Sequence, residues 1–441
     1  MNHLDRLQDL LAEARRAGAD EADAVLFEST SLSAKRRLGE IEKIERSESF
    51  DLGLRVFVGR RQAIVSSKDR DPARFAALAE RAVAMARVVP EDPFGGLPDA
   101  VPVPARDLDL CDGAEPDADR LLERAARAEE AALAVAGVTN TEGADAGWGR
   151  TEVALATSRG FAGGYARSSH SVVATALAGT GTGMERDYDY SSTVHLADLG
   201  DAALIGRRAG EKAVRRLNPR RPASGRFPVV FDPRVANSLL GHLAGAINGA
   251  SVARGTTFLK NALGQRVMAA GIVVRDDPFR PRGLRSRPFD AEGMPGEARR
   301  VVEHGVLTTW ILDWRSARQL GLASTGHAGR GTSSPPGPTT TNLWMEPGPL
   351  APDALMADIA EGIYVTELIG MGVNGVTGDY SRGASGFMIR QGQLAEPVSE
   401  FTIAGHLREM FLNLTPASDL VFRYGTDAPT LRIEGLTIAG A

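Results

Sequence analysis

The chain has 441 residues, of which 43% are hydrophobic and 24% charged, a composition typical of a globular protein with two or three domains. Its formal net charge is −5 and its pI about 5.9, so it lacks the basic surface of nucleic-acid-binding proteins, and we expect no nucleic acid as a partner. No run of about 20 apolar residues is present, so we expect no membrane span. The single cysteine, Cys111, excludes an intramolecular disulfide. The beginning of the chain has no signal-peptide pattern, so the expected location is the cytoplasm.

The first part of the chain predicts a compact α+β unit. A strand is expected over 22–30, and the clearest hairpin lies at 51–67, where apolar residues alternate on both sides of a glycine turn. An amphipathic helix follows over 72–89. Because 90–104 holds five prolines and two adjacent glycines, we interpret residues 1–104 as an N-terminal domain with its linker.

The rest of the chain predicts two further regions and completes an α+β fold. Residues 105–221 form a central region of strands between two helices, expected at 114–138 and 199–217. Residues 222–441 predict a large β-rich C-terminal domain built around one buried helix. This domain contains a long polar loop at 324–341, a length that is usually functional or disordered.

The expected buried helix, over 232–250, has two unlike faces. Asp232 and Pro233 are typical of a helix start. The other half of its surface is almost bare because of its glycines, and an interior glycine costs roughly 1 kcal/mol relative to alanine. Either another element packs closely on this face or the helix bends there; we favour close packing. Apolar residues at four-residue spacing predict one buried stripe: Val235, Leu239, Leu243 and Ile247.

This segment resembles the core motif of the TldD/PmbA family of metallopeptidases. In TldD-type chains the helix reads H-E-x-x-x-H, with a further Glu three residues on and a Gly-Thr-Ser/Thr element after it. Here ARGTT at 253–257 sets the register. His242 lies nearby but out of register, so the chain resembles the metal-free PmbA, or TldE, branch. The two histidines are replaced by Leu240 and Gly245, the general-base Glu by Gly241 and the later Glu by Asn248.

The resemblance extends over nearly the whole chain and is strongest near its end. The strings GVTGDYSRGASGFMI at 375–389, PVSEFTIAGHL at 397–407 and PTLRIEGLTIAG at 429–440 are all similar to PmbA-type sequence. One departure is His406, which stands where the family phrase TIAGN has asparagine.

The resemblance implies a function for a pair of chains. A TldD-type partner would carry the zinc site, and this chain would be a non-catalytic subunit of the heterodimer, or a homodimer when alone. The implied enzyme degrades unfolded or unstructured peptides and processes peptide precursors. On this interpretation the chain has no catalytic residue, metal or cofactor of its own.

Several polar residues are candidates for binding a peptide or a partner. Asp379, Tyr380, Ser381 and Arg382 lie between glycines and predict a polar loop, which would serve either as a binding cluster or as a hydrogen-bonded turn. His242 is a further candidate, and the neighbouring residues Arg186, Asp187 and Tyr188 form a weaker one.

Two other functions remain open at this stage. The chain could act alone as a homo-oligomeric peptide-binding or scaffold protein without hydrolase activity. It could also be a peptidase with a metal site unlike that of the family. The peptidase with its own metal site has the least support, because there is no H-E-x-x-H motif and no two of the seven histidines lie within five residues of each other.

Overall fold

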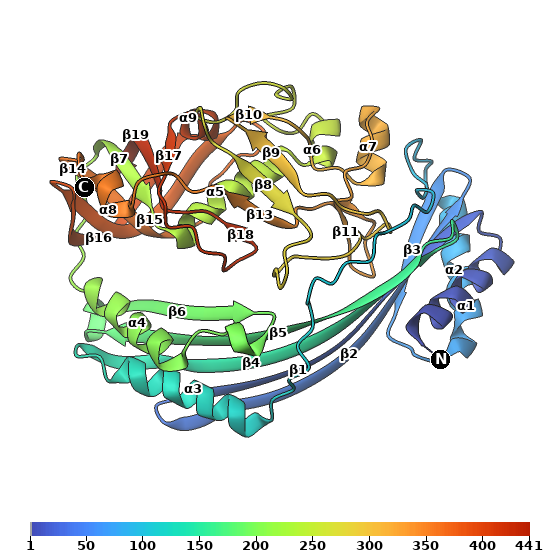
Figure 1. Cartoon of the computed structure of the whole chain (residues 1–441), viewed down its shortest axis with the longest axis horizontal. Helices are drawn as coiled ribbons and strands as arrows, with labels where there is room; N and C mark the ends of the chain where they lie inside the picture. The colour runs from blue at the N-terminus through green and yellow to red at the C-terminus, as the bar shows by residue number, and fades with distance from the viewer. Residues whose placement is uncertain (1) are drawn as a thin grey trace.

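The computed structural model describes residues 2–441 and confirms the predicted α+β class. The N-terminal half is built on one antiparallel sheet in the order β3-β2-β1-β4-β5-β6, which curves beneath the C-terminal half (Figure 1). The strands of this sheet are β1 (Glu21–Arg37), β2 (Glu40–Val58), β3 (Arg61–Ser67), β4 (Val138–Thr157), β5 (Ala162–Ala178) and β6 (Glu185–Thr193).

Strand β1 joins the first two predicted regions. It pairs with β2 on one side and with β4 on the other, where Asp23 lies opposite Thr157. Its polar second half, which gives little apolar alternation, continues the strand because both neighbours extend alongside it. Strands from residues 1–104 and 105–221 therefore share one sheet, and whether these ranges are separate folding units stays a prediction.

The predicted hairpin at 51–67 is confirmed: it consists of the end of β2, a turn at Gly59 and β3. Four helices cover one face of this sheet. Helices α1 and α2 pack at one end of the sheet and α3 and α4 at the other (Figure 1). Within residues 2–441 none of the helices is both long and apolar enough to cross a membrane. The helices are α1 (His3–Arg16), α2 (Phe75–Val88), α3 (Ala118–Leu133) and α4 (Ala202–Arg215).

The C-terminal half contains the largest hydrophobic core. Its main sheet has the order β16-β15-β14-β7-β19-β17, and an additional pairing of β16 with β19 closes five of these strands into a ring. Helix α5 (Pro233–Ala246) packs its apolar stripe into this core, which confirms the expected β-rich domain around a helix. The strands are β7 (Gly225–Phe231), β14 (Glu361–Ile369), β15 (Asp379–Arg390), β16 (Gln393–His406), β17 (Leu414–Pro416) and β19 (Leu431–Ala439).

A second, smaller sheet adjoins this core in the order β10-β9-β8-β13-β18. We predicted strand structure over 301–313 with a turn at His304 and Gly305. The turn is confirmed between β9 and β10. The strand pairing ends at Leu307, however, and a short helix, α7 (Trp314–Leu320), begins where Asp313 accepts the Ser316 N–H. The strands are β8 (Val274–Asp277), β9 (Arg299–Glu303), β10 (Val306–Leu307), β13 (Asn342–Met345) and β18 (Thr426–Asp427), and the remaining helices are α6 (Gly249–Ala253), α8 (Pro352–Met356) and α9 (Leu407–Leu412).

The polar loop at 324–341 attaches the C-terminal half to the N-terminal sheet. It contains two short paired strands, β11 (Ala328–Gly329) and β12 (Gly337–Pro338), and it contacts β1 and β2. Its Arg330 forms a buried ion pair with Asp23 of β1. Its backbone also lies so close to β2 that a Cβ atom on Gly53 would be 2.4 Å from the carbonyl oxygen of Thr332. This loop is therefore structural.

Replacing Gly53 should weaken this attachment. Gly53→Ala places a methyl group against rigid backbone, and we expect it to lower the free energy of unfolding by about 1–3 kcal/mol. The matched control is Gly331→Ala in the same loop, where a Cβ atom meets nothing within 4 Å. Urea unfolding of both variants checks the prediction, and equal stability of the two would contradict it.

Candidate functional site

The segment that resembles the family motif forms two helices, α5 and α6. Asp232 caps the start of α5, where its side chain accepts the N–H of Arg234 at 3.0 Å. The helix then ends at Ala246, and the side chain of Asn248 accepts the N–H groups of the first turn of α6, at Ala250 and Ser251. The predicted start is confirmed, but the predicted single helix over 232–250 is wrong, because an asparagine cap interrupts it.

The four positions that replace the family motif do not fit a zinc ion. Leu240 is fully buried in the hydrophobic core, whereas Gly245 is exposed, as expected for positions about 140° apart on a regular helix. Gly241 offers no side chain. The amide of Asn248 caps α6 and donates to the carbonyl oxygen of Pro338 at 2.8 Å. Within residues 2–441 no three His, Cys, Asp or Glu side chains are gathered so that they could hold a metal ion.

The bare face of α5 is open. A Cβ atom on Gly241 or on Gly245 would meet nothing within 4 Å, so our prediction of close packing is wrong for these two residues. It is right for Gly249, where a Cβ atom would lie 2.4 Å from the side chain of Leu312. Successive residues spaced three or four apart lie on one helix face. The open face of α5 therefore runs from Arg234 past the two glycines.

The predicted polar cluster at 379–382 is the beginning of strand β15, not a loop. Alternation along the strand separates its members. Tyr380 is buried, and its ring meets the ring of His242 edge-on at 6.0 Å. Arg382 shares the face of Tyr380. Asp379 and Ser381 are exposed on the other face, so the structure unites only three of the five candidates.

Burial dominates the electrostatics of this cluster. It lowers the pKa of His242, and the positive charge of Arg382 lowers it further, so the imidazole is neutral at pH 7. Burial raises the pKa of the Tyr380 phenol, which stays protonated. Neither the Nε2 atom of His242 nor the hydroxyl of Tyr380 has a hydrogen-bond partner in the part of the chain that the structure describes. His242 and Tyr380 are therefore an uncharged pair beside the open face of α5.

A cavity of about 280 Å³ lies where the two halves of the chain meet beside this cluster. It is formed by residues of β6, the end of α4, the start of α5 and the neighbouring strands β14 and β15. It brings the Arg382 candidate together with the weaker candidate at 186–188. Its lining consists of Arg186, Asp187, Tyr188, Arg216, Arg234, Val235, Ser238, Thr366, Glu367, Leu368 and Arg382.

Buried ion pairs hold this cavity together, and sequence reasoning missed them. Arg234 of α5 donates two hydrogen bonds to Asp187 of β6, at 2.6 and 3.0 Å. Arg216, at the end of α4, donates to Glu367 of β14 at 2.5 Å. The arginines lower the pKa of Asp187 against the opposing effect of burial. The sequence signal was the alternation in β6, which places two aspartates on one buried face.

His406, the departure from the family phrase, also has a structural role. Its Nδ1 atom accepts the N–H of Arg408 at 3.2 Å and caps α9, while its Nε2 atom lies 3.0 Å from the carbonyl oxygen of Thr377. The imidazole therefore carries its proton on Nε2, which donates to that carbonyl. It ties the beginning of α9 to the turn before β15.

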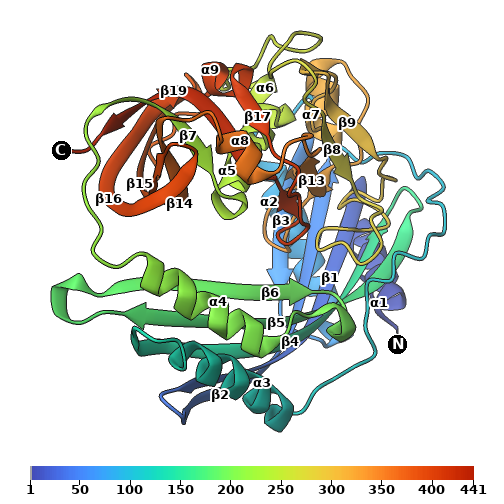
Figure 2. The same ribbon diagram turned by 60° about the vertical axis from the view of Figure 1, so that its left-hand side comes forward.

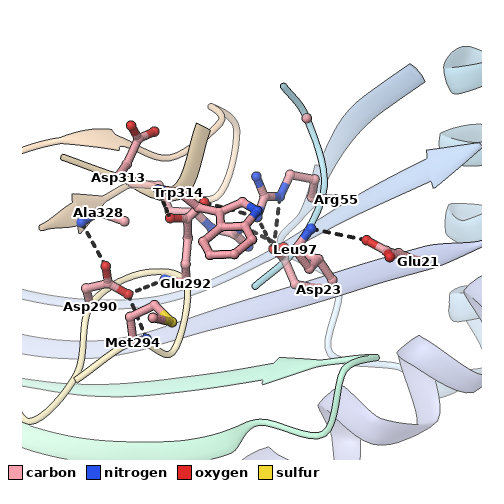
Figure 3. Close-up of polar contacts among 12 residues, drawn as sticks. Glu21, Asp23, Arg55, Leu97, Asp290, Glu292, Met294, Asp313, Trp314 and Ala328 are labelled. Atoms are coloured by element: carbon pink, nitrogen blue, oxygen red, sulfur yellow. Dashed lines mark hydrogen bonds and ion pairs between the residues drawn. The ribbon is translucent and has the colours of Figure 1, made fainter. Parts of the chain in front are cut away.

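A buried cluster of charges lies at the joint between the halves (Figure 3). Asp23 accepts hydrogen bonds from Arg55, at 2.9 Å from its Nε atom, and from Arg330. Glu292 lies beside them and accepts the backbone N–H of Trp314 at 2.8 Å. Burial raises the pKa of Glu292 to about 8, so this carboxyl is mostly protonated at neutral pH.

Three family models match consecutive parts of the chain. They are PmbA/TldA metallopeptidase domain 1 at 22–86, the central domain at 111–217 and the C-terminal domain at 224–440. The chain belongs to the PmbA/TldD metallopeptidase family. It is 36% identical to metalloprotease PmbA of Escherichia coli O157:H7 over 427 residues, 96% of this chain and 93% of that protein.

Other proteins match this chain over nearly its whole length. A metalloprotease PmbA homolog of Haemophilus influenzae is 34% identical over 97% of this chain and 94% of its own length. Among solved structures, a proposed modulator of DNA gyrase from Bacteroides thetaiotaomicron has a TM-score of 0.90 at 27% identity, over 99% of this chain and 98% of that chain. TldE of Thermococcus kodakarensis shares the fold, with a TM-score of 0.88 at 21% identity, covering 99% of this chain and 100% of that one.

The glycines of α5 should respond to alanine in opposite ways. Gly241→Ala and Gly245→Ala each add a methyl group in open space, and we expect each to raise the free energy of unfolding by about 0.5–1 kcal/mol. Gly249→Ala, in contact with Leu312, should lower it by at least about 1 kcal/mol. Urea unfolding measures all three, and loss of stability at the first two positions would show that their face is covered.

The protonation of Glu292 makes stability depend on pH. Its carboxyl releases its proton near pH 4.5 in the unfolded chain but near pH 8 in the folded one, so stability falls as pH rises between these values. Glu292→Gln keeps an acceptor for the Trp314 N–H and removes this loss. We expect the variant to gain about 2–4 kcal/mol relative to the native chain between pH 5 and pH 8.

The control for this experiment is Glu297→Gln, an exposed residue in the same loop. Chemical unfolding at several pH values gives the difference between each variant and the native chain. A difference for Glu292→Gln that does not change with pH would contradict the prediction.

Proposed function

We propose that this chain is the non-catalytic subunit of a heterodimeric zinc metallopeptidase that acts on unfolded or unstructured peptides. The observation that carries the proposal is the state of α5. The helix at the place of the family motif is folded and its glycine face is open, but the motif positions hold a buried leucine, two bare glycines and an asparagine that caps α6. Such residues neither bind zinc nor activate water. The zinc would then reside on a TldD-type partner.

An exposed apolar surface supports association with that partner. The turn between β14 and β15 leaves Ile369, Met371 and Val376 largely exposed, with Met371 at 91%. This turn adjoins the open site, because the carbonyl oxygen of Ile369 accepts a hydrogen bond from Arg382 at 3.3 Å. Exposed apolar groups gathered in this way are typical of protein contacts. We place the complex in the cytoplasm, whose reducing conditions suit a chain with a single cysteine.

The same surface favours one alternative. A second copy of this chain could cover the apolar turn, which would make a homo-oligomeric peptide-binding or scaffold protein without hydrolase activity. The two functions differ in whether any peptide is cleaved when a TldD-type chain is added.

Cleavage assays with both chains test the proposal. We expect the purified chain alone to leave a labelled unstructured peptide intact, and its mixture with a TldD-type chain to cleave that peptide until a zinc chelator is added. Cleavage by this chain alone that a chelator abolishes would contradict the proposal, and no cleavage by the mixture would favour the scaffold. As a variant, Gly245→Arg should lower the activity of the mixture at least tenfold by filling the open face. Gly113→Arg, also exposed and in open space, is its control.

A further inference from the structure

Strand β6 ends the N-terminal sheet with a free edge. Within residues 2–441 it pairs only with β5, and its other side faces the C-terminal half (Figure 2). An unpaired edge offers backbone N–H and C=O groups to another strand. Proteins usually cover or shorten such an edge, but β6 has nine residues and is interrupted by neither proline nor a bulge.

The hydrogen bonds around β6 indicate which residues face this edge. Tyr188 lies opposite Thr175 of β5, whose carbonyl oxygen accepts a hydrogen bond from Thr141 of β4 and therefore points away from β6. Tyr188 is thus in a pair without mutual hydrogen bonds, and its backbone N–H and C=O face outward. Its N–H donates to the carboxylate of Asp187 at 2.7 Å and its carbonyl oxygen accepts from Lys212 at 3.5 Å, so a further strand would have to displace these contacts at this residue. Every second residue of a strand presents its backbone N–H and C=O to the same side, so those of Arg186, Tyr190 and Ser192 also face outward. No backbone group of these last three has a partner beyond β5 in the described part of the chain.

A groove runs beside the free edge. The cavity of about 280 Å³ at Arg234 adjoins one of about 380 Å³, because Tyr188 and Arg234 line both. That second cavity adjoins a third of about 230 Å³, and the residues that line both include Tyr190 and Arg423. The three together line β6 from Arg186 to Thr193, so the groove is about as long as the strand, roughly 30 Å.

The groove has aromatic walls and free positive charges. The rings of Tyr188 and Tyr190 are stacked at 6.2 Å, and Tyr424 lies 5.7 Å from Tyr190. Arg208 and Arg423 are exposed at one end and Arg382 is half-buried at the other, and none of the three forms an ion pair within residues 2–441.

The acidic residues of the groove are already engaged. Asp187 and Asp189 are paired with Arg234 and Lys212. Asp232 accepts the Arg234 N–H and the Tyr364 hydroxyl, and Asp419 accepts both donors of Thr430. The side chains free to bind a ligand at the two ends are therefore arginines, whose guanidinium groups suit carboxylates.

We propose that the groove along β6 binds an extended peptide that carries acidic side chains, with the peptide backbone added to the free edge of β6 as a further strand. The backbone pairing would be independent of sequence, and the arginines would select acidic segments. This inference rests on the proposed function for the class of ligand, an unstructured peptide. The binding that it describes belongs to this chain alone.

Fluorescence anisotropy with designed peptides tests the proposal on the purified full chain. The probe is a fluorescein-labelled nine-residue peptide of alternating Glu and Thr, and its partner has Lys in place of each Glu. We expect the acidic peptide to bind at least about tenfold more tightly, with the difference reduced by salt. Methylation of alternate backbone nitrogens on one edge should weaken binding about tenfold, because it removes the strand hydrogen bonds. Equal binding of both peptides, no effect of methylation, or no binding would each overturn the proposal.

Two charge reversals on α4 localise the site. Arg208→Glu, which changes a residue of the groove, should weaken binding of the acidic peptide about fivefold or more. Arg207→Glu makes the same change in net charge on an exposed residue outside the groove and should have little effect. Equal losses in both variants would mean that the peptide responds to overall charge, which would overturn the assignment to the groove.

The result is separable from the proposed function. Cleavage by the mixture of chains without peptide binding to this chain would overturn the groove alone. Selective binding of the acidic peptide without cleavage in any mixture would keep the groove and overturn the role in a peptidase.

Discussion

One buried carboxylate determines how the two halves of the molecule are joined. Asp23 is completely buried, and an isolated charge in that position would cost several kcal/mol. Arg55 from the neighbouring strand and Arg330 from the C-terminal loop together compensate it and lower its pKa. The attachment of the loop to the sheet is therefore required by charge as well as by shape. A second ion pair, between Arg234 and Asp187, links α5 directly to β6 beside the groove.

The sequence was most informative where structure depends on neighbours along the chain. The start of α5 at Asp232 and the hairpin at 51–67 follow from local capping and alternation, and both were predicted correctly. The sequence could not tell which glycines of α5 are covered, because that depends on Leu312 and other distant residues. Asn248 was a signal for a helix break that the family register obscured. The glycines around 379–382 suggested a loop, although strand pairing with β16 keeps these residues extended.

The candidate site combines residues that no local pattern connects. The cavity beside α5 needs Asp187, Arg216, Arg234 and Glu367, which come from four elements and meet only in the folded chain. Family resemblance located the helix, and the structure added what surrounds it. The segment with the motif positions packs against the hydrophobic core, although the residues at these positions do not fit a zinc ion.

The distance in sequence between Asp23 and Arg330 has a consequence for folding. The partner of Asp23 is separated from it by 307 residues, and strand β1 also waits for β4, more than 100 residues later. Contacts of such high contact order form slowly, since a long loop must close before they contribute. During synthesis the first hairpin therefore exposes the pairing edge of β1 until β4 has emerged, and the charge cluster around Asp23 stays incomplete until Arg330 has emerged. Chaperone dependence in the cell would be a natural result of this topology.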